Sequence, residues 1–194
     1  MSRAPEPKAI PYHVEVPVSS SEPPSAFDEH AEQYDLLVNW PRRLANEEPF
    51  YRRLFEEVGV RRVLDAACGT GHHAAMFHAW GLQVEGADIS PGMIARCRAR
   101  LGEPPGLKWV VRAFDQPAEA GKFDAVICVG NSLALAEDLP VVHAALGQML
   151  AALRPGGICI AGVLNLWSLP PGTTVWQKCM RVDYQRADHI LLKS

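Results

Sequence analysis

The stretch Val63–Ala74, VLDAACGTGHHA, decides the fold. It begins with apolar residues typical of a buried strand, and Gly69, Gly71 and Ala74 follow in G-x-G-x-x-A spacing. Such a turn after a strand is typical of a site that holds a nucleotide at the start of a helix. Asp65, however, places a carboxylate four residues before the first glycine. The kind of nucleotide that fits beside this charge is therefore the first question.

Strands and helices alternate along the chain on both sides of this turn. Strands are expected at 61–67, 83–89, 107–113, 123–130 and 158–164, and helices at 27–38, 48–58, 71–80, 91–101 and 138–153. Strands separated by helices of this length imply crossover connections between parallel strands. The expected fold class is α/β, a doubly wound and mostly parallel sheet with helices on both faces. Ligands bind such sheets at the carboxyl ends of the strands.

The two ends of the chain differ from this pattern. Residues 1–25 contain six of the sixteen prolines, which predicts a flexible or extended segment before a single domain at 26–194. Near the other end, 175–184 and 187–194 each predict one strand. Because the chain stops inside an apolar segment, we expect its C-terminal strands to be incomplete and the sequence to be a piece of a longer protein.

Composition excludes several classes of function. The 194 residues suit one domain, and a formal net charge of −3 gives no reason to expect a nucleic-acid partner. The five cysteines are odd in number and widely spaced, which argues for a reducing compartment and against a disulfide framework or a metal site. No apolar run is long enough to predict a membrane partner or a secretory leader. A cytoplasmic protein is expected, and a homo-oligomer stays open.

Two kinds of nucleotide cofactor use a glycine turn in this architecture. A dinucleotide places its diphosphate over the helix start, and Asp88, at the end of the second strand, suits the acid that holds its ribose. An NAD-dependent oxidoreductase is therefore one hypothesis. A carboxylate at Asp65 would repel the diphosphate by about 4 kcal/mol at 4 Å and an effective dielectric constant of 20. S-adenosylmethionine carries an ammonium and a sulfonium and no phosphate, so the acid favours this cofactor.

At this point the chain resembles the class I S-adenosylmethionine-dependent methyltransferases. The resemblance rests on four segments in the family's order: VLDAACGTG, VEGADISPGMI, FDAVICVGNS and LRPGGICI. It extends from about Tyr34 to Leu164 and implies a Rossmann-like methyltransferase fold. A glycine pattern that follows D-x-x-x is more specific than a lone glycine pattern.

Within this family the chain is most similar to the glycine and sarcosine N-methyltransferases. Arg43, 22 residues before Asp65, matches the arginine that clamps the cofactor carboxylate in those enzymes, and Gly130–Ser132 matches their GNS segment. The resemblance implies a cofactor site made of Tyr34, Arg43, Asp65, Ala66, Gly69, Gly71, Asp88, Ile89, Met93, Phe114, Asp115, Gly130 and Asn131. Asn131 is also expected beside the methyl acceptor. No catalytic acid or base is expected, because the cofactor supplies the electrophile and the protein supplies position.

The acceptor is expected to be a small molecule, with an amine nitrogen favoured and an oxygen left open. One departure from the relatives bears on it. Where the glycine-specific enzymes place an arginine that holds the substrate carboxylate, this chain has Leu164, which puts glycine in doubt. That departure and the short C-terminus also keep open a non-catalytic module that binds S-adenosylmethionine.

Several of these residues also have purely structural interpretations. Asp65 could cap a helix or pair with Arg61 or Arg62, and Asp88 could cap the helix that follows it. Trp40 and Tyr34 could wall the acceptor pocket or could simply pack in the core. His72 and His73 could be ordinary residues at a helix start rather than a catalytic base.

Overall fold

The computed structural model describes residues 8–11, 34–36, 38–164, 178–184 and 187–193. Its centre is a five-stranded sheet in which every pair of neighbours is parallel. The strands, in the order in which they lie, are β4 Leu107–Val111, β3 Gln83–Asp88, β2 Arg62–Asp65, β5 Phe123–Cys128 and β6 Leu153–Ala161. The order reverses between β2 and β5. The crevice above their carboxyl ends is where open α/β sheets bind ligands.

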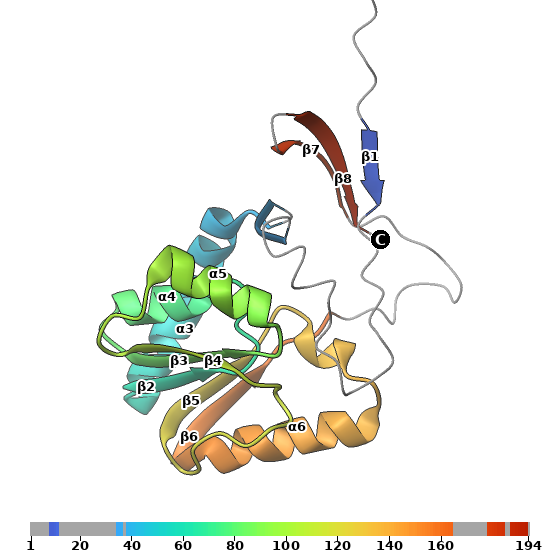
Figure 1. Cartoon of the computed structure of the whole chain (residues 1–194). Helices are drawn as coiled ribbons and strands as arrows, with labels where there is room; N and C mark the ends of the chain where they lie inside the picture. The colour runs from blue at the N-terminus through green and yellow to red at the C-terminus, as the bar shows by residue number, and fades with distance from the viewer. Residues whose placement is uncertain (1–7, 12–33, 37, 165–177, 185–186, 194) are drawn as a thin grey trace, which may run out of the picture.

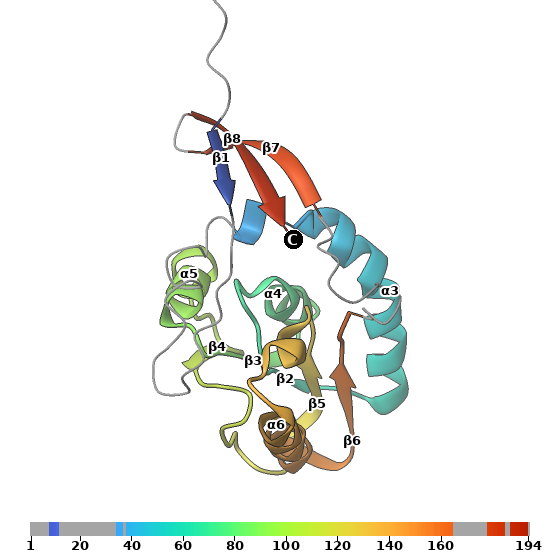
Figure 2. The same cartoon turned by 90° about the vertical axis from the view of Figure 1, so that its right-hand side faces the viewer.

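Helices cover both faces of this sheet (Figure 1), which confirms the expected fold class. On one face lie α3 Trp40–Val58, α4 His72–Ala79 and α5 Pro91–Leu101. On the other face lies α6 Leu139–Ala152, preceded by the short 3-10 helix η1 Ser132–Leu135. Figure 2 shows the same layers edge-on. Two apolar clusters, one on each face of the sheet, form the core.

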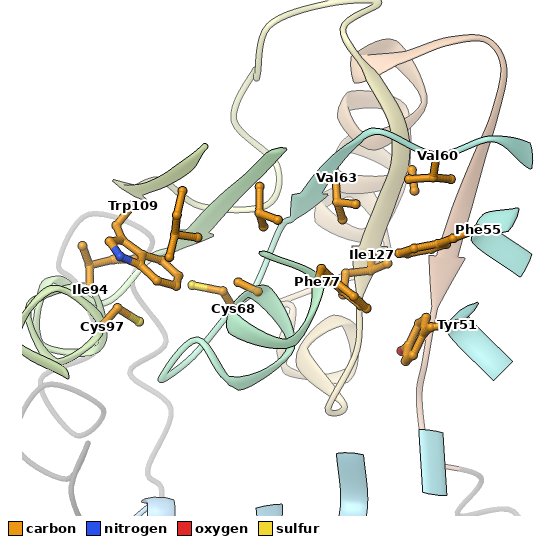
Figure 3. Close-up of a cluster of buried hydrophobic side chains, with 14 residues drawn as sticks. Tyr51, Phe55, Val60, Val63, Cys68, Phe77, Ile94, Cys97, Trp109 and Ile127 are labelled. Atoms are coloured by element: carbon orange, nitrogen blue, oxygen red, sulfur yellow. The ribbon is translucent and has the colours of Figure 1, made fainter. Parts of the chain in front are cut away.

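The larger cluster joins α3 and α4 to the strands (Figure 3). Tyr51, Phe55 and Phe77 meet with ring centroids 5.1 to 5.8 Å apart, at the inclined angles that aromatic rings prefer. At the other end of the cluster Trp109 is 2% exposed, as expected for a core residue. Its indole Nε1 donates to the Gly102 carbonyl at 2.8 Å, so the ring is fixed in position.

The position of Trp109 explains why the nucleotide turn needs glycine. Gly71 has a φ of 78°, a left-handed conformation that side chains rarely adopt. A Cβ on Gly71 would also lie 2.6 Å from the Trp109 ring and 2.9 Å from the Cys97 sulfur. The left-handed backbone and the lack of space therefore both exclude any residue larger than glycine at position 71.

Two predicted elements begin well before their expected first residues. The helix expected at 48–58 begins at Trp40, because Asn39 caps it by accepting from the Arg42 N–H at 3.1 Å, and the helix then continues through Pro49. A proline inside a helix removes one backbone hydrogen bond, but burial of the helix face outweighs that loss. The last expected strand begins at Leu153 rather than at residue 158, so the RPGG turn lies inside β6, beside a register shift opposite β5.

The predicted C-terminal strands are present as β7 Lys178–Tyr184 and β8 Ala187–Lys193. They do not extend the main sheet. They pair with each other in antiparallel fashion, and β8 pairs in parallel with β1 Lys8–Pro11 to form a separate three-stranded sheet. The β1 strand lies inside the proline-rich N-terminal segment, most of which, like most of the helix expected at 27–38, is outside the described residues.

A search of the described residues found no helix long and apolar enough to cross a bilayer.

Candidate functional site

The glycine turn after β2 is tied to the end of β3 by a carboxylate. Asp88 Oδ2 accepts from the Gly69 N–H at 2.8 Å, and its Oδ1 accepts from the Ser90 N–H at 3.0 Å. The cap of α5 is Ser90, whose Oγ accepts from the Met93 N–H at 3.1 Å, so Asp88 is not that cap. Asp88 thus fixes the turn. An ionised carboxylate can accept about four hydrogen bonds in all, so one such group can serve more than one donor.

Asp65 lies at the end of β2 and is 1% exposed. Among the described residues no donor forms a hydrogen bond with either of its oxygens; the Ala67 N–H lies near enough to lower its pKa but not in hydrogen-bond geometry. The pKa of Asp65 is raised to about 7, mainly by burial; the charge of Asp88 contributes to this rise and His73 opposes it. A buried carboxylate without a partner is costly. A cation brought by a ligand would satisfy it.

Neither structural interpretation of Asp65 is correct. The backbone N–H groups of Arg61 and Arg62 both donate to Asp124 Oδ2 at 2.7 Å. This contact lies at the amino end of β2, whereas Asp65 lies at its carboxyl end. The helix that follows the turn begins after Gly71 without a side-chain cap.

A chain of three polar side chains, Arg43, Glu47 and His73, runs from α3 to α4 beside Asp65. Arg43 Nε donates to Glu47 Oε1 at 2.9 Å, and Glu47 Oε2 lies 2.6 Å from His73 Nε2. The Arg43 guanidinium carbon lies 5.1 Å from the centre of the Trp40 ring. Within the described residues the two Nη groups of Arg43 make no hydrogen bond. They are available for a ligand carboxylate, which a guanidinium binds well.

Tyr34 lies across the glycine turn. A Cβ on Gly69 would be 3.8 Å from a ring carbon of Tyr34, and a Cβ on Gly130 would be 4.0 Å from its hydroxyl oxygen. Burial raises the pKa of this phenol, although the charge of Arg43 lowers it. Tyr34 therefore bridges the loops that follow β2 and β5, the two sides of the crevice.

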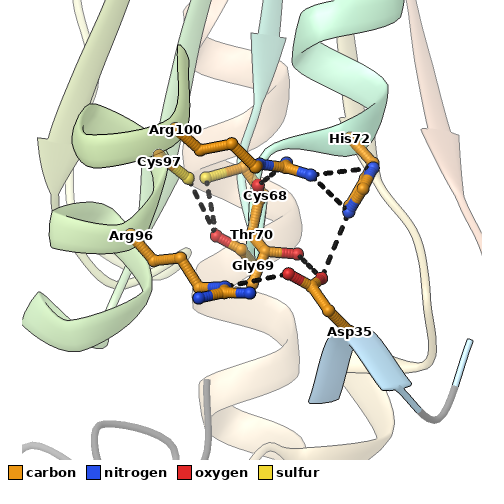
Figure 4. Close-up of polar contacts among 8 residues, drawn as sticks. All are labelled: Asp35, Cys68, Gly69, Thr70, His72, Arg96, Cys97 and Arg100. Carbon is orange, nitrogen blue, oxygen red and sulfur yellow. Dashed lines mark hydrogen bonds and ion pairs between the residues drawn. The ribbon is translucent and has the colours of Figure 1, made fainter. Parts of the chain in front are cut away.

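Beside Tyr34, the carboxylate of Asp35 joins three side chains in a group that we call the Asp35 cluster (Figure 4). Thr70 Oγ1 donates to Asp35 Oδ1 at 2.6 Å, and His72 Nε2 lies 3.1 Å from the same oxygen. Arg96 Nε donates to Asp35 Oδ2 at 2.9 Å. Burial would raise the pKa of Asp35, but these hydrogen bonds outweigh it and lower the pKa well below its usual value. The sequence interpretation missed this cluster, because its partners lie 35 to 61 residues away along the chain.

Asn131, the residue expected beside the methyl acceptor, lies in the loop after β5. Its backbone is left-handed, with φ at 77°, and its Oδ1 accepts from the Leu164 N–H at 2.9 Å. The loops after β5 and β6 are thereby joined. The Leu164 side chain is 52% exposed, and residues 164–177 contain no arginine or lysine.

The other predicted cofactor residues are distributed around the same edge. The Ala66 N–H donates to the Ile127 carbonyl at 2.8 Å, and Ile89 is 45% exposed beyond the end of β3. Met93 is buried within α5, and Phe114 packs against the apolar cluster on the α6 face. Asp115 lies in the turn that follows β4.

Trp40, His72 and His73, for which the sequence left two roles open, have structural partners. Trp40 is 8% exposed and stacks on the His72 ring at 4.2 Å, so it packs rather than walls a pocket. His73 is 5% exposed and bonded to Glu47. Neither histidine is presented to the crevice as an unengaged base.

Comparisons with known proteins agree with this geometry. Residues 63–157 match a family described as a methyltransferase domain. The chain is 35% identical over 140 residues to the glycine/sarcosine N-methyltransferase of Parasynechococcus marenigrum (strain WH8102), covering 69% of this chain and 49% of that protein. It is 32% identical over 174 residues to the glycine N-methyltransferase of Rattus norvegicus, covering 79% and 59%. The chain thus spans about half to three fifths of the length of these relatives.

Two solved methyltransferase structures are also similar to this chain. An amino pentose methyltransferase from Micromonospora echinaspora, solved with S-adenosylmethionine bound, aligns with a TM-score of 0.60 and 25% identity over 79% of this chain and 61% of its own. A sugar N-methyltransferase from Streptoalloteichus aligns with a TM-score of 0.57 and 28% identity over 70% and 53%. The motifs, the sheet order and these similarities agree: the chain carries a methyltransferase domain of the class I S-adenosylmethionine-dependent family.

Proposed function

We propose that this protein transfers a methyl group from S-adenosylmethionine to an amine nitrogen of a small molecule that has no carboxylate for the site to hold. The observation that carries the cofactor assignment is Asp65, a buried carboxylate without a hydrogen-bond partner among the described residues. An ammonium group next to it would remove the cost of its burial. The guanidinium of Arg43 would take the carboxylate that is bonded to the same α-carbon as the ammonium, and Asp88 would hold the ribose.

The cofactor supplies a methyl group on a positively charged sulfur. Transfer breaks the S–C bond, forms an N–C bond and leaves a neutral thioether, while the amine nitrogen loses one proton to solvent. The protein needs to hold both partners in line and to keep water out. No general base is needed if the amine arrives uncharged, which is consistent with the engagement of His72 and His73 by carboxylates.

Two observations support an amine without a carboxylate. The relatives named above act on glycine, sarcosine or amino sugars, as their names state. At Leu164 this chain presents an exposed apolar side chain, and the next thirteen residues contain no cation that could replace the arginine of the glycine-specific enzymes. The Asn131 amide, with its oxygen fixed by the Leu164 N–H, would direct its NH₂ group to the acceptor.

The test is a panel of acceptors, with formation of S-adenosylhomocysteine as the signal. We expect turnover of amino sugars and simple primary amines, and at least tenfold lower kcat/KM for glycine and sarcosine. Leu164→Arg should shift the preference towards glycine, because it restores a charge partner for the carboxylate. Leu150→Arg is the matched control, since Leu150 is also exposed (61%) but lies on α6.

Two results would contradict the proposal. One is a preference of the natural protein for glycine. The other is turnover of phenols and of no amine. Tight binding of S-adenosylmethionine without turnover of any acceptor would instead support a non-catalytic binding module, and tight binding of NAD alone would support the oxidoreductase hypothesis.

A further inference from the structure

A positioning role for Asp35 follows from the contacts of the segment that carries Tyr34. We propose that Asp35 holds Tyr34 over the cofactor turn and thereby sets the rate at which the cofactor enters and leaves. The inference rests on the cofactor site proposed above, but not on the identity of the acceptor.

Tyr34 lies over the glycine turn. Its ring lies over Gly69 and its hydroxyl reaches towards Gly130, so it spans the crevice from the loop after β2 to the loop after β5. A ligand bound along these two loops would lie against the Tyr34 side chain. Exchange of that ligand therefore requires Tyr34 to move.

Tyr34 is held in this position mainly through the contacts of its neighbour Asp35. Its ring meets Trp40 only loosely, with centroids 6.2 Å apart. The side-chain hydrogen bonds described for segment 34–36 all go to Asp35, which accepts them from Thr70, His72 and Arg96. Figure 4 shows these partners converging on the Asp35 carboxylate from two elements: the glycine turn with the start of α4, and α5.

The Asp35 cluster is built onto the same turn that would hold the cofactor. Thr70 lies between the two glycines of the turn and is fully buried. Arg100 reinforces it from α5, since Arg100 Nη2 donates to the Thr70 carbonyl at 2.5 Å. Tyr34 and the turn beneath it are therefore fixed to each other through one carboxylate. A residue in this position acts on exchange through Tyr34 and does not touch the reacting atoms.

The carboxylate is suited to this role because it remains charged. The hydrogen bonds of the cluster lower the pKa of Asp35 well below the pH of any ordinary assay. Loss of the charge by substitution, rather than by titration, is therefore the way to weaken the contacts.

The experiment measures dissociation of S-adenosylhomocysteine by stopped flow, which needs no methyl acceptor. We expect Asp35→Asn to release the ligand roughly 10 to 100 times faster than the natural protein, the scale of one lost charge-assisted hydrogen bond. The matched control is Glu48→Gln, which removes an exposed carboxylate that pairs with Arg52 at 2.6 Å on α3. Its dissociation rate should stay within twofold of that of the natural protein.

A double-mutant cycle separates positioning from general loss of structure. Tyr34→Ala alone should release the ligand quickly, and adding Asp35→Asn to it should change the rate by less than twofold, because Asp35 acts through Tyr34. Multiplicative effects of the two substitutions would overturn the proposal. So would a dissociation rate for Asp35→Asn equal to that of Glu48→Gln. Neither result would bear on the choice of acceptor, which the amine panel tests separately.

Discussion

Replacing Asp65 with asparagine should have opposite effects on stability and on cofactor binding. The carboxylate is 1% exposed and without a hydrogen-bond partner among the described residues, and its pKa is raised from 3.8 to about 7. Because the pKa is higher in the folded state, the folded protein keeps a proton that the unfolded chain loses. Stability therefore falls as the pH rises from about 4 to about 7, and the full cost is present above that range.

The size of this cost follows from the shift. About three pKa units at 1.36 kcal/mol each give about 4 kcal/mol as an upper limit at pH 8. Asparagine removes the charge but leaves a buried amide, which costs about 1 to 3 kcal/mol if it too lacks a partner. We therefore expect Asp65→Asn to stabilise the cofactor-free protein at pH 8 by about 1 to 3 kcal/mol, or on the order of 5 °C in Tm. The gain should vanish near pH 5.

Thermal unfolding of the cofactor-free protein at pH 5 and pH 8, followed by calorimetric titration with S-adenosylmethionine, provides the assay. The same substitution should weaken cofactor binding roughly 10- to 100-fold, since it removes the partner of a cation. Asp124→Asn is the matched control. Burial would raise the pKa of Asp124, but hydrogen bonds from Arg154 and two backbone N–H groups lower it, so that this substitution should destabilise the protein at pH 8. Loss of stability in both variants, or unchanged cofactor affinity for Asp65→Asn, would refute the reasoning.

Three further predictions concern the same site. Gly71→Ala should lower the free energy of unfolding by at least about 2 kcal/mol in chemical denaturation, because a Cβ would lie 2.6 Å from the Trp109 ring at a φ of 78°; a stable variant would contradict this. Asp88→Ala should weaken S-adenosylmethionine binding by about 1.5 to 3 kcal/mol in calorimetry and loosen the turn at Gly69, whereas equal affinity would dismiss its role. Arg43→Ala should reduce binding of S-adenosylmethionine much more than binding of a decarboxylated analogue, and equal losses for both ligands would argue against the carboxylate contact.

The structure also changes the basis on which a cationic ligand is inferred. A fully charged Asp65 would repel a diphosphate by about 4 kcal/mol. With a pKa of about 7, neutralising Asp65 at pH 7 costs less than about 1 kcal/mol, so repulsion alone discriminates weakly. The stronger reason is that the buried carboxylate has no partner of its own. Burial produces both effects, and burial cannot be read from the motif.

For Asp88, too, one feature follows from the sequence and another only from the tertiary structure. Its position at the end of the second strand was predictable, because the period of apolar residues and the spacing from the glycine turn are local features. Its hydrogen bond to the Gly69 N–H was not, because that contact joins residues 19 apart whose approach depends on how β2 and β3 pair. The start of α3 at Trp40 was missed for another reason: tertiary packing of one helix face keeps the helix continuous through Pro49.

The sequence by itself determined the alternation of strands and helices, the glycine turn after the first strand of the main sheet and the acid beside it, because these depend on residues close together in the chain. Only the tertiary structure decided which groups meet at the crevice. Asp35 reaches Thr70 and Arg96 across 35 and 61 residues, and β1 pairs with β8 from opposite ends of the chain. Contacts of this kind are set by the packing of whole elements against one another, and no local pattern of residue types encodes them.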